Sequence, residues 1–113
     1  MSSSPQASVD LEEARSLLSS GAAILLDVRE QHEWDAGHAA EAVHMPIEEL
    51  DAAALPTGIQ IITTCRSGGR GARAAAALTE AGRQARNLTG GMRGWQDAGL
   101  PMETTDGEPG SVE

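Results

Sequence analysis

The chain holds one cysteine, Cys65, in the segment Cys65-Arg66-Ser67-Gly68-Gly69-Arg70. A thiolate is a strong nucleophile, and main-chain N–H groups together with guanidinium groups favour the thiolate over the thiol. Glycine can adopt the positive φ angles that turn successive amides toward one point. We therefore expect a nucleophile in an anion-binding loop. The candidate nucleophile is Cys65, and the candidate anion-binding residues are Arg66, Ser67, Gly68, Gly69 and Arg70.

A lone cysteine is more often a buried, inert, apolar side chain than a reactive one. The surroundings of Cys65 argue for reactivity, because a reactive cysteine needs an electropositive setting. Residues 59–64 before the loop are largely β-branched and apolar, and residues 71–81 after it are rich in alanine. The predicted order is strand, loop and helix, which leaves the unpaired amides of a first helical turn facing the loop.

Several separated segments resemble single-domain rhodaneses, a family of sulfurtransferases. Residues 65–70 resemble the active-site loop of that family, and residues 26–29 (Leu-Asp-Val-Arg) with Glu33-Trp34 and Gly37-His38 resemble its first signature. Residues 88–95 followed by Gly99-Leu100-Pro101 resemble its C-terminal signature. The pattern departs from the family at Glu41, where a glycine is usual, and at Thr64, where an aromatic residue is common.

The resemblance implies a reaction and its partners. Cys65 would take the sulfane sulfur of thiosulfate or a related small anionic donor, and amides of residues 66–70 would hold the resulting persulfide. Cyanide, a thiol or a sulfur-accepting protein would then receive the sulfur. No cofactor is implied. The histidines at 32, 38 and 44 are spaced unsuitably for a metal site, so we expect none.

The remaining chain predicts an α/β fold, in which a small parallel sheet carries helices on both faces. We expect strands at 23–28, 42–45 and 85–88, and helices from Asp10, at 30–34, 47–50 and 92–98. Asp10 would cap the first helix, with Glu13 reaching back. The chain divides into a flexible leader (1–8), one rhodanese-like domain (9–102) and a disordered acidic tail (103–113).

A formal charge of −9 argues against nucleic acid and anionic membranes as partners. Residues 66–93 nevertheless contain six arginines and one glutamate, so the site itself is basic. A single cysteine and the lack of a signal-peptide pattern favour a cytoplasmic location. Arginines 73, 83 and 86 are expected to form a solvated face.

Roles for the other residues follow from position. Arg66 is the candidate for donor recognition, because guanidinium matches an oxyanion. Arg70 has two open roles, as a ligand of the donor or as a structural partner of an acidic residue. Asp27 and Arg29 are expected to make internal hydrogen bonds. Trp34 and Trp95 are expected to anchor the core, and for Trp95 the alternative is a place in the lining of the pocket.

Two other functions compete with sulfur transfer. A cysteine-dependent phosphatase would use a similar cradle, but the resemblance associates that activity with a longer loop than the six residues found here. A persulfide carrier or a regulatory binding module would act on a partner protein. The cysteine argues against an inactive module, whereas a carrier uses the same chemistry.

Overall fold

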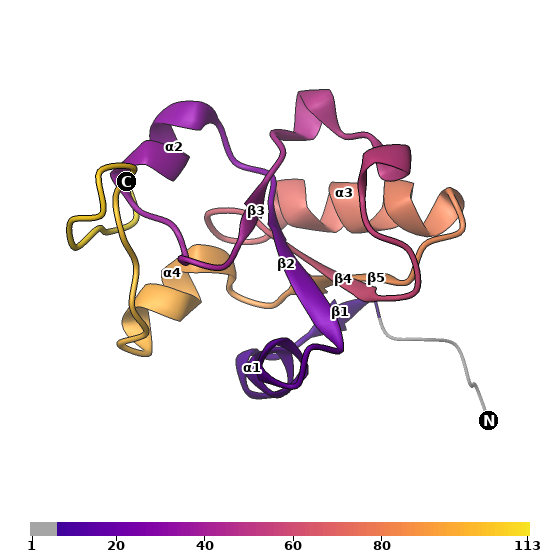
Figure 1. The fold of residues 1–113 in the computed structure, drawn as a ribbon, viewed down its shortest axis with the longest axis horizontal. Coiled ribbons are helices and arrows are strands. Elements are labelled where there is room, and N and C mark those ends of the chain that lie inside the picture. The colour runs from indigo at the N-terminus through magenta and orange to yellow at the C-terminus, as the bar shows by residue number, and fades with distance from the viewer. Residues whose placement is uncertain (1–6) are drawn as a thin grey trace.

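The computed structural model describes residues 7–113 and shows a five-stranded parallel sheet with helices on both faces (Figure 1). The strands are Ser8–Val9 (β1), Ala23–Asp27 (β2), Val43–His44 (β3), Gln60–Thr64 (β4) and Ala85–Leu88 (β5). The helices are Leu11–Ser19 (α1), Gln31–Ala36 (α2), Gly69–Glu80 (α3) and Gly91–Asp97 (α4), with 3-10 turns at Ile47–Glu49 (η1) and Ala52–Ala54 (η2). The strand order is β1-β5-β4-β2-β3. The predicted fold class is confirmed.

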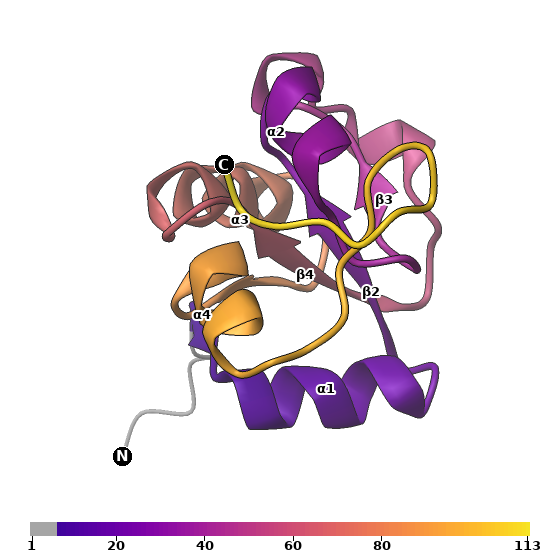
Figure 2. The same ribbon diagram turned by 90° about the vertical axis from the view of Figure 1, so that its left-hand side faces the viewer.

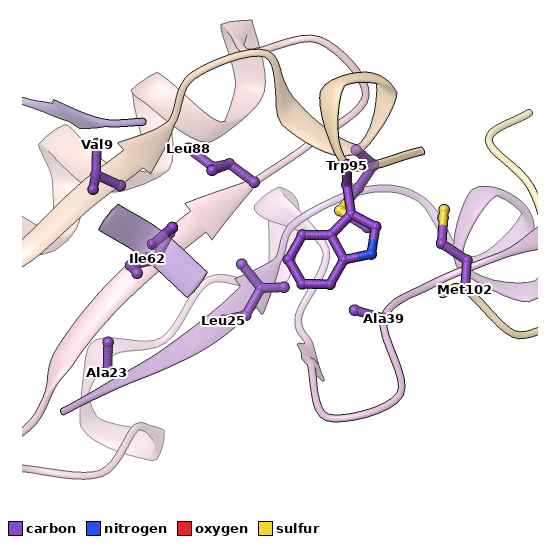
Figure 3. Packing of buried hydrophobic residues seen from close by; sticks show 10 residues of the cluster. Val9, Ala23, Leu25, Ala39, Ile62, Leu88, Trp95 and Met102 are labelled. Atoms are coloured by element: carbon purple, nitrogen blue, oxygen red, sulfur yellow. The ribbon is translucent and has the colours of Figure 1, made fainter. Parts of the chain in front are cut away.

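The two central strands, β2 and β4, divide the core between the faces of the sheet. Leu25 lies opposite Ile62 and Leu26 opposite Thr63, so alternate residues point to opposite faces. One face carries α1 and α4, and the other carries α3 (Figure 2). On the first face Trp95 packs near Leu25 in the cluster drawn in Figure 3. That cluster contains Val9, Ala14, Ala23, Leu25, Ala39, Ile62, Leu88, Met92, Trp95 and Met102.

The second face is covered by the alanine-rich helix α3. Its buried residues are small apart from Leu78, which lets the helix backbone lie close to the sheet. Cys65 belongs to this second cluster, so the candidate nucleophile lies where the core meets the loop. The cluster contains Leu26, Val28, Leu55, Ile61, Cys65, Ala74 and Leu78.

Most predicted boundaries are within two residues of the observed ones, and three differences bear on the site and the termini. Helix α3 begins at Gly69, two residues before the predicted start, so the end of the candidate loop is already helical. Ser8, placed in the leader, pairs with Asn87 in strand β1, while the leader residues 1–6 lie outside the described part of the chain. The turn η2 was not predicted, because two or three residues carry too little periodicity to detect.

The cap of α1 is partly as predicted. The Asp10 side chain accepts a hydrogen bond from the main-chain N–H of Glu13 at 2.8 Å. Glu13 does not reach back, however, because its carboxylate pairs with Arg86 at 3.2 Å. Arg86 and Arg83 are therefore more than a solvated face, since Arg83 also donates to the main-chain oxygen of Ala52 at 2.7 Å.

The segment 103–113 packs on the domain, although its composition predicted disorder. Glu103 forms antiparallel bridges with His38 and with Pro109. The N–H of Ser111 donates to the oxygen of Ala36 at 3.1 Å. These contacts are made mostly by the main chain, so the residue types do not reveal them. None of the helices formed by residues 7–113 is long and apolar enough to cross a membrane.

Candidate active site

The candidate loop lies at the carboxyl end of the sheet, where ligands of parallel α/β sheets bind. Cys65 directly follows Thr64, the last residue of β4, and α3 begins at Gly69. Helix α4 begins nearby at Gly91, after β5. Two helix starts therefore converge on one short loop, as the sequence predicted for α3 alone.

The thiol of Cys65 is enclosed but makes a polar contact. The residue is 1% exposed and packs in the second core cluster. Its Sγ accepts a hydrogen bond from the main-chain N–H of Gly68 at 3.1 Å. This geometry favours a sulfur that carries negative charge, because the N–H dipole points at it.

Helix α4 holds the outer side of the loop. The N–H of Met92 donates to the oxygen of Cys65 at 2.8 Å, and the N–H of Arg93 donates to the oxygen of Arg66 at 3.0 Å. A Cβ at Gly91 would lie 2.5 Å from the Cys65 oxygen, so only glycine allows this approach. The first-turn donors of α4 are thus used to fix two loop carbonyls.

A third loop carbonyl, that of Gly68, is fixed by α3 and β5. It accepts the N–H of Ala72 at 2.9 Å and the side-chain amide of Asn87 at 3.2 Å. Gly68 has a φ of 144°, a conformation that residues with a side chain rarely adopt. The backbone therefore reverses at Gly68, with its oxygen directed to β5 and its N–H directed to Cys65.

Several loop amides remain uncommitted. Within residues 7–113, the main-chain N–H groups of Arg66, Ser67, Gly69 and Arg70 donate to no other protein atom. The peptide bonds are trans, so each N–H points opposite to the carbonyl of the preceding residue. Because the carbonyls of Cys65, Arg66 and Gly68 are held outside the loop, the following amides are free for an anion.

Arg70 forms an ion pair with Glu33 of α2. Its Nη1 and Nη2 lie 2.6 and 2.9 Å from the two carboxylate oxygens of Glu33. The hydrogen bonds from Arg70 lower the pKa of Glu33 to about 2. The same pairing raises the pKa of Arg70. Of the two roles left open by the sequence, the structure shows Arg70 tying the start of α3 to α2.

Arg66 is exposed and contacts the end of the described chain. Its Nε donates to the main-chain oxygen of Glu113 at 2.9 Å. The Glu113 carboxylate in turn lies 3.1 Å from the Nε2 of His32. The predicted donor-recognition residue therefore lies beside the loop, and its Nε is bonded to Glu113. Glu113 belongs to residues 110–113, which we call the C-terminal strap.

Comparison with known proteins agrees with this geometry. The model of the rhodanese-like domain matches residues 10–98. The chain belongs to the rhodanese-like domain family. It is 34% identical over 120 residues to thiosulfate sulfurtransferase 18 of Arabidopsis thaliana, covering 90% of this chain and 87% of that protein. It is 35% identical over 104 residues to human thiosulfate:glutathione sulfurtransferase, covering 77% and 90%.

A solved structure shows the same fold. The rhodanese-related protein of Thermoplasma volcanium superposes with a TM-score of 0.79 and 27% identity, over 86% of this chain and 97% of that one. Relatives at this level place the chain among sulfurtransferase-type rhodanese-like domains.

The first family signature of this rhodanese-like domain forms a buried polar network. Asp27 and Arg29 are fully buried and lie 2.7 Å apart, and Arg29 also donates to the oxygen of Gly37 at 2.7 Å. Their predicted internal role is confirmed. Trp95 is a core anchor, but Trp34 is not, because it stacks between the rings of His38 and His44. The polar rings exclude it from the apolar clusters.

Two residues near the loop were not assigned a role from the sequence. Glu33 stood in the first signature, but its partner Arg70 is 37 residues away. Asn87 lies in an ordinary strand sequence, so nothing local marks it. Of the two departures from the family, Thr64 is buried beneath the loop and Glu41 is exposed on a turn. Among residues 7–113 no group of histidine, cysteine and acidic side chains is suited to hold a metal ion.

Proposed function

We propose that this rhodanese-like domain transfers a sulfane sulfur from thiosulfate, or a related small anionic donor, through a persulfide on Cys65 to cyanide or a thiol. The observation that carries the proposal is the contact of Sγ with the Gly68 N–H inside a loop with uncommitted amides. Such a loop stabilises negative charge on sulfur and on a bound anion. Cys65 is the catalytic residue in this proposal.

In the first half-reaction the Cys65 thiolate attacks the outer sulfur of thiosulfate. A bond forms between Sγ and that sulfur, and the S–S bond of thiosulfate breaks. Sulfite leaves with the bonding electron pair, and Cys65 carries an anionic persulfide. The amides of Arg66, Ser67, Gly68, Gly69 and Arg70 supply the donors, and the Arg66 side chain binds the donor's oxygens.

In the second half-reaction an acceptor attacks the outer sulfur of the persulfide. Cyanide forms a bond to that sulfur, and the electrons of the persulfide S–S bond return to Sγ. Thiocyanate leaves, and the Cys65 thiolate is regenerated. A thiol acceptor reacts in the same way and leaves as its own persulfide. The loop donors serve both half-reactions because each places negative charge at the same point.

The arrangement of the arginines favours sulfur over phosphate. A phosphoester presents several charged oxygens and needs a guanidinium for bidentate binding. Arg70 is the only arginine at the helical end of the loop, and Glu33 occupies two of its nitrogens. The single negative charge of the Cys65 persulfide needs only the amides.

The test is the intact mass of the protein after treatment with thiosulfate. We expect wild-type protein to gain one sulfur atom, and cyanide or a dithiol to remove it. The Cys65→Ser variant should gain no sulfur and should lose thiosulfate:cyanide activity by at least about 1,000-fold, because no nucleophile remains. A Cys65→Ser variant with undiminished activity, or hydrolysis of phosphoesters without sulfur uptake, contradicts the proposal.

A further inference from the structure

Asn87 is buried beneath the Cys65 loop in an arrangement that core packing does not explain. The residue is 8% exposed, and its Oδ1 has no hydrogen-bond partner within the described chain. An unpaired buried amide oxygen is destabilising. The orientation of the amide group is fixed nevertheless, because its Nδ2 donates to the oxygen of Gly68 at 3.2 Å and the reverse orientation would place two oxygens together.

A second destabilising feature is tied to the same side chain. Gly71 lies in the first turns of α3, where alanine would be the better helix former. A Cβ on residue 71 would lie 2.2 Å from the Oδ1 of Asn87, so the helix carries glycine there to make room. The chain thus tolerates an unpaired oxygen and a helical glycine, and both follow from having asparagine at position 87.

The compensating feature is the orientation of the peptide between Gly68 and Gly69. Asn87 holds its oxygen toward β5, so the N–H of Gly69 points the opposite way across the planar peptide. That N–H is one of the uncommitted donors of the loop. The preceding N–H, that of Gly68, reaches Sγ of Cys65 at 3.1 Å. That N–H belongs to the Ser67–Gly68 peptide, which Asn87 does not contact. Together with the N–H of Ala72, Asn87 fixes the adjoining Gly68–Gly69 peptide and so the direction of the Gly69 N–H.

We propose that Asn87 is a positioning residue that holds the Gly68–Gly69 peptide in the orientation needed to stabilise negative charge on Cys65. The inference rests on the proposed function for its role in turnover, but the effect on the thiol is independent of it. Because the loop donors act most strongly on charge that develops at the sulfur, loss of Asn87 lowers kcat more than it raises KM.

The chain offers a matched control at the neighbouring position. Thr63 lies beside Asn87 in the sheet, and its Oγ1 donates to the oxygen of Gly71 at 2.7 Å. Thr63→Val removes a buried hydrogen bond to the same helix without touching the Gly68–Gly69 peptide. The comparison separates a general weakening of α3 from a change in the loop.

The experiment measures two rates for Asn87→Ala, Thr63→Val and wild type: alkylation of Cys65 by iodoacetamide at neutral pH, and steady-state sulfur transfer from thiosulfate to cyanide. We expect Asn87→Ala to lower the alkylation rate about tenfold and kcat by about 10- to 100-fold, with KM changed by less than about threefold. Thr63→Val should leave both rates within about twofold of wild type while lowering the Tm at least as much. Asn87→Asp keeps the shape and removes the donor, so it should resemble Asn87→Ala.

Equal losses in Asn87→Ala and Thr63→Val, or unchanged rates in Asn87→Ala, overturn the inference. Failure of the proposed function has a different signature. In that case wild-type protein takes up no sulfur from thiosulfate, while Asn87→Ala still slows alkylation by iodoacetamide. If Asn87→Ala does not fold, the same rates in Asn87→Asp decide.

The C-terminal strap, residues 110–113, supports a second inference on separate observations. Figure 2 shows the yellow end of the chain running between α2 and α4. Its residues are held by the oxygen of Ala36, by the Gln96 side chain, which accepts the N–H of Val112 at 2.6 Å, and by the Nε of Arg66. The strap therefore holds one nitrogen, Nε, of the guanidinium that the proposed function assigns to the donor, beside a cysteine that is 1% exposed.

We infer that the strap is a removable cover that competes with the anionic donor for Arg66. The strap packs on the domain where the backbones of Gly110 and Gly37 meet. A Cβ on Gly110 would lie 2.7 Å from the Cα of Gly37 and 2.9 Å from the oxygen of Ala36. Gly110→Ala should therefore dislodge the strap, including Val112 at the edge of the first apolar cluster, without a new contact at the Cys65 loop. Asp106→Ala, an exposed change in the same segment, is the control.

The test compares the KM for thiosulfate. We expect Gly110→Ala to lower it about three- to tenfold, because the donor no longer displaces the strap, and Asp106→Ala to leave it unchanged. In Arg66→Gln, where the strap and the donor both lose their partner, adding Gly110→Ala should change the KM by less than about twofold. An unchanged or raised KM in Gly110→Ala with persulfide still formed refutes the cover, whereas no persulfide in any variant refutes the proposed function instead.

Discussion

Two neighbouring regions at the carboxyl end of the sheet use their polar groups in opposite ways. In the first, Asp27 accepts hydrogen bonds from the main chain and from two side-chain nitrogens of Arg29, and both residues are fully buried. In the second, the carbonyls of Cys65, Arg66 and Gly68 accept hydrogen bonds from other parts of the chain. The main-chain N–H groups at positions 66, 67, 69 and 70 donate to no described protein atom. In the first region the two charges are paired with each other, and among the described residues only Nη1 of Arg29 lacks a partner. In the second region several donors are left free.

The difference separates support from chemistry. A buried charge must be paired where it lies, so the Asp27–Arg29 network stabilises the end of β2 and binds nothing else. A loop that binds a sulfur anion must instead keep its N–H donors free. Its conformation is then maintained by hydrogen bonds from α3, α4 and Asn87 to its carbonyls. Changes in the first region should therefore reduce stability, and changes in the second should reduce reactivity.

The largest effect on stability is expected from Asp27→Ala. The change leaves the Arg29 guanidinium buried without a counter-charge, which typically costs about 3–5 kcal/mol of unfolding free energy. Urea denaturation measures the loss. The double variant Asp27→Leu/Arg29→Met, which removes both charges, should recover most of it. A single variant as stable as wild type would show that the network is not the support we describe.

Gly91→Ala should mainly reduce the reactivity of Cys65, with a smaller loss of stability than Asp27→Ala. The new Cβ would lie 2.5 Å from the oxygen of Cys65, so the loop must shift. We expect alkylation of Cys65 to slow by about 10- to 100-fold, with a stability loss of about 1–3 kcal/mol from overpacking. Gly99→Ala is the control, since Gly99 also has a positive φ but open space around it. Similar alkylation rates in both variants would show that strain at any glycine, rather than the clamp on the loop, sets the rate.

The Glu33–Arg70 pair lies between the two regions and should give the smallest effect. The hydrogen bonds from Arg70 lower the pKa of Glu33 from 4.5 to about 2. A depressed carboxyl pKa stabilises the fold above the unfolded value and loses that contribution as the pH falls through the folded value. Glu33→Gln should therefore cost about 1–2 kcal/mol at neutral pH.

The cost of Glu33→Gln should shrink between about pH 4.5 and pH 2, because the wild type then loses the same ionised pair. Thermal unfolding of both proteins across this range measures it. The exposed Glu49→Gln provides the matched change without a buried partner. A difference between wild type and Glu33→Gln that stays constant down to pH 2 would mean that the charge of Glu33 contributes nothing.

The sequence predicted the parts of the molecule whose signals are local. Residues 59–64 are largely β-branched, a loop with two glycines follows, and an alanine-rich segment comes next. The strand, the loop and the helix were therefore all predicted, with Cys65 between the strand and the helix. Apolar runs, helical spacing and the glycines and prolines between them predicted the order of the other elements. The predicted start of α3 was two residues late. The helix begins at Gly69, inside the candidate loop, where the glycines indicate a turn rather than a helix.

The contacts that complete the site could not be predicted, because they join residues distant in sequence. Asn87 lies 19 residues from Gly68, and Glu113 lies 47 residues from Arg66. Asparagine at position 87 and glutamate at position 113 are ordinary residues for a strand and for a chain end. In each contact one partner is a main-chain oxygen, so the residue type of that partner gives no signal. The disorder expected for residues 103–113 was inferred from composition. Composition does not reveal main-chain hydrogen bonds such as those between this segment and residues 35–38.

Helix α4 connects the chemistry to the interior of the protein. Its first turn donates hydrogen bonds to the oxygens of Cys65 and Arg66. Met92 and Trp95 of the same helix belong to the first apolar cluster, in which Figure 3 labels Trp95. If those side chains pack less tightly, the first turn of α4 shifts and its hydrogen bonds to the loop change. The rate at which the Cys65 thiol reacts therefore depends on how tightly the interior is packed. A simple alkylating reagent can thus report on the integrity of the whole fold through one sulfur atom.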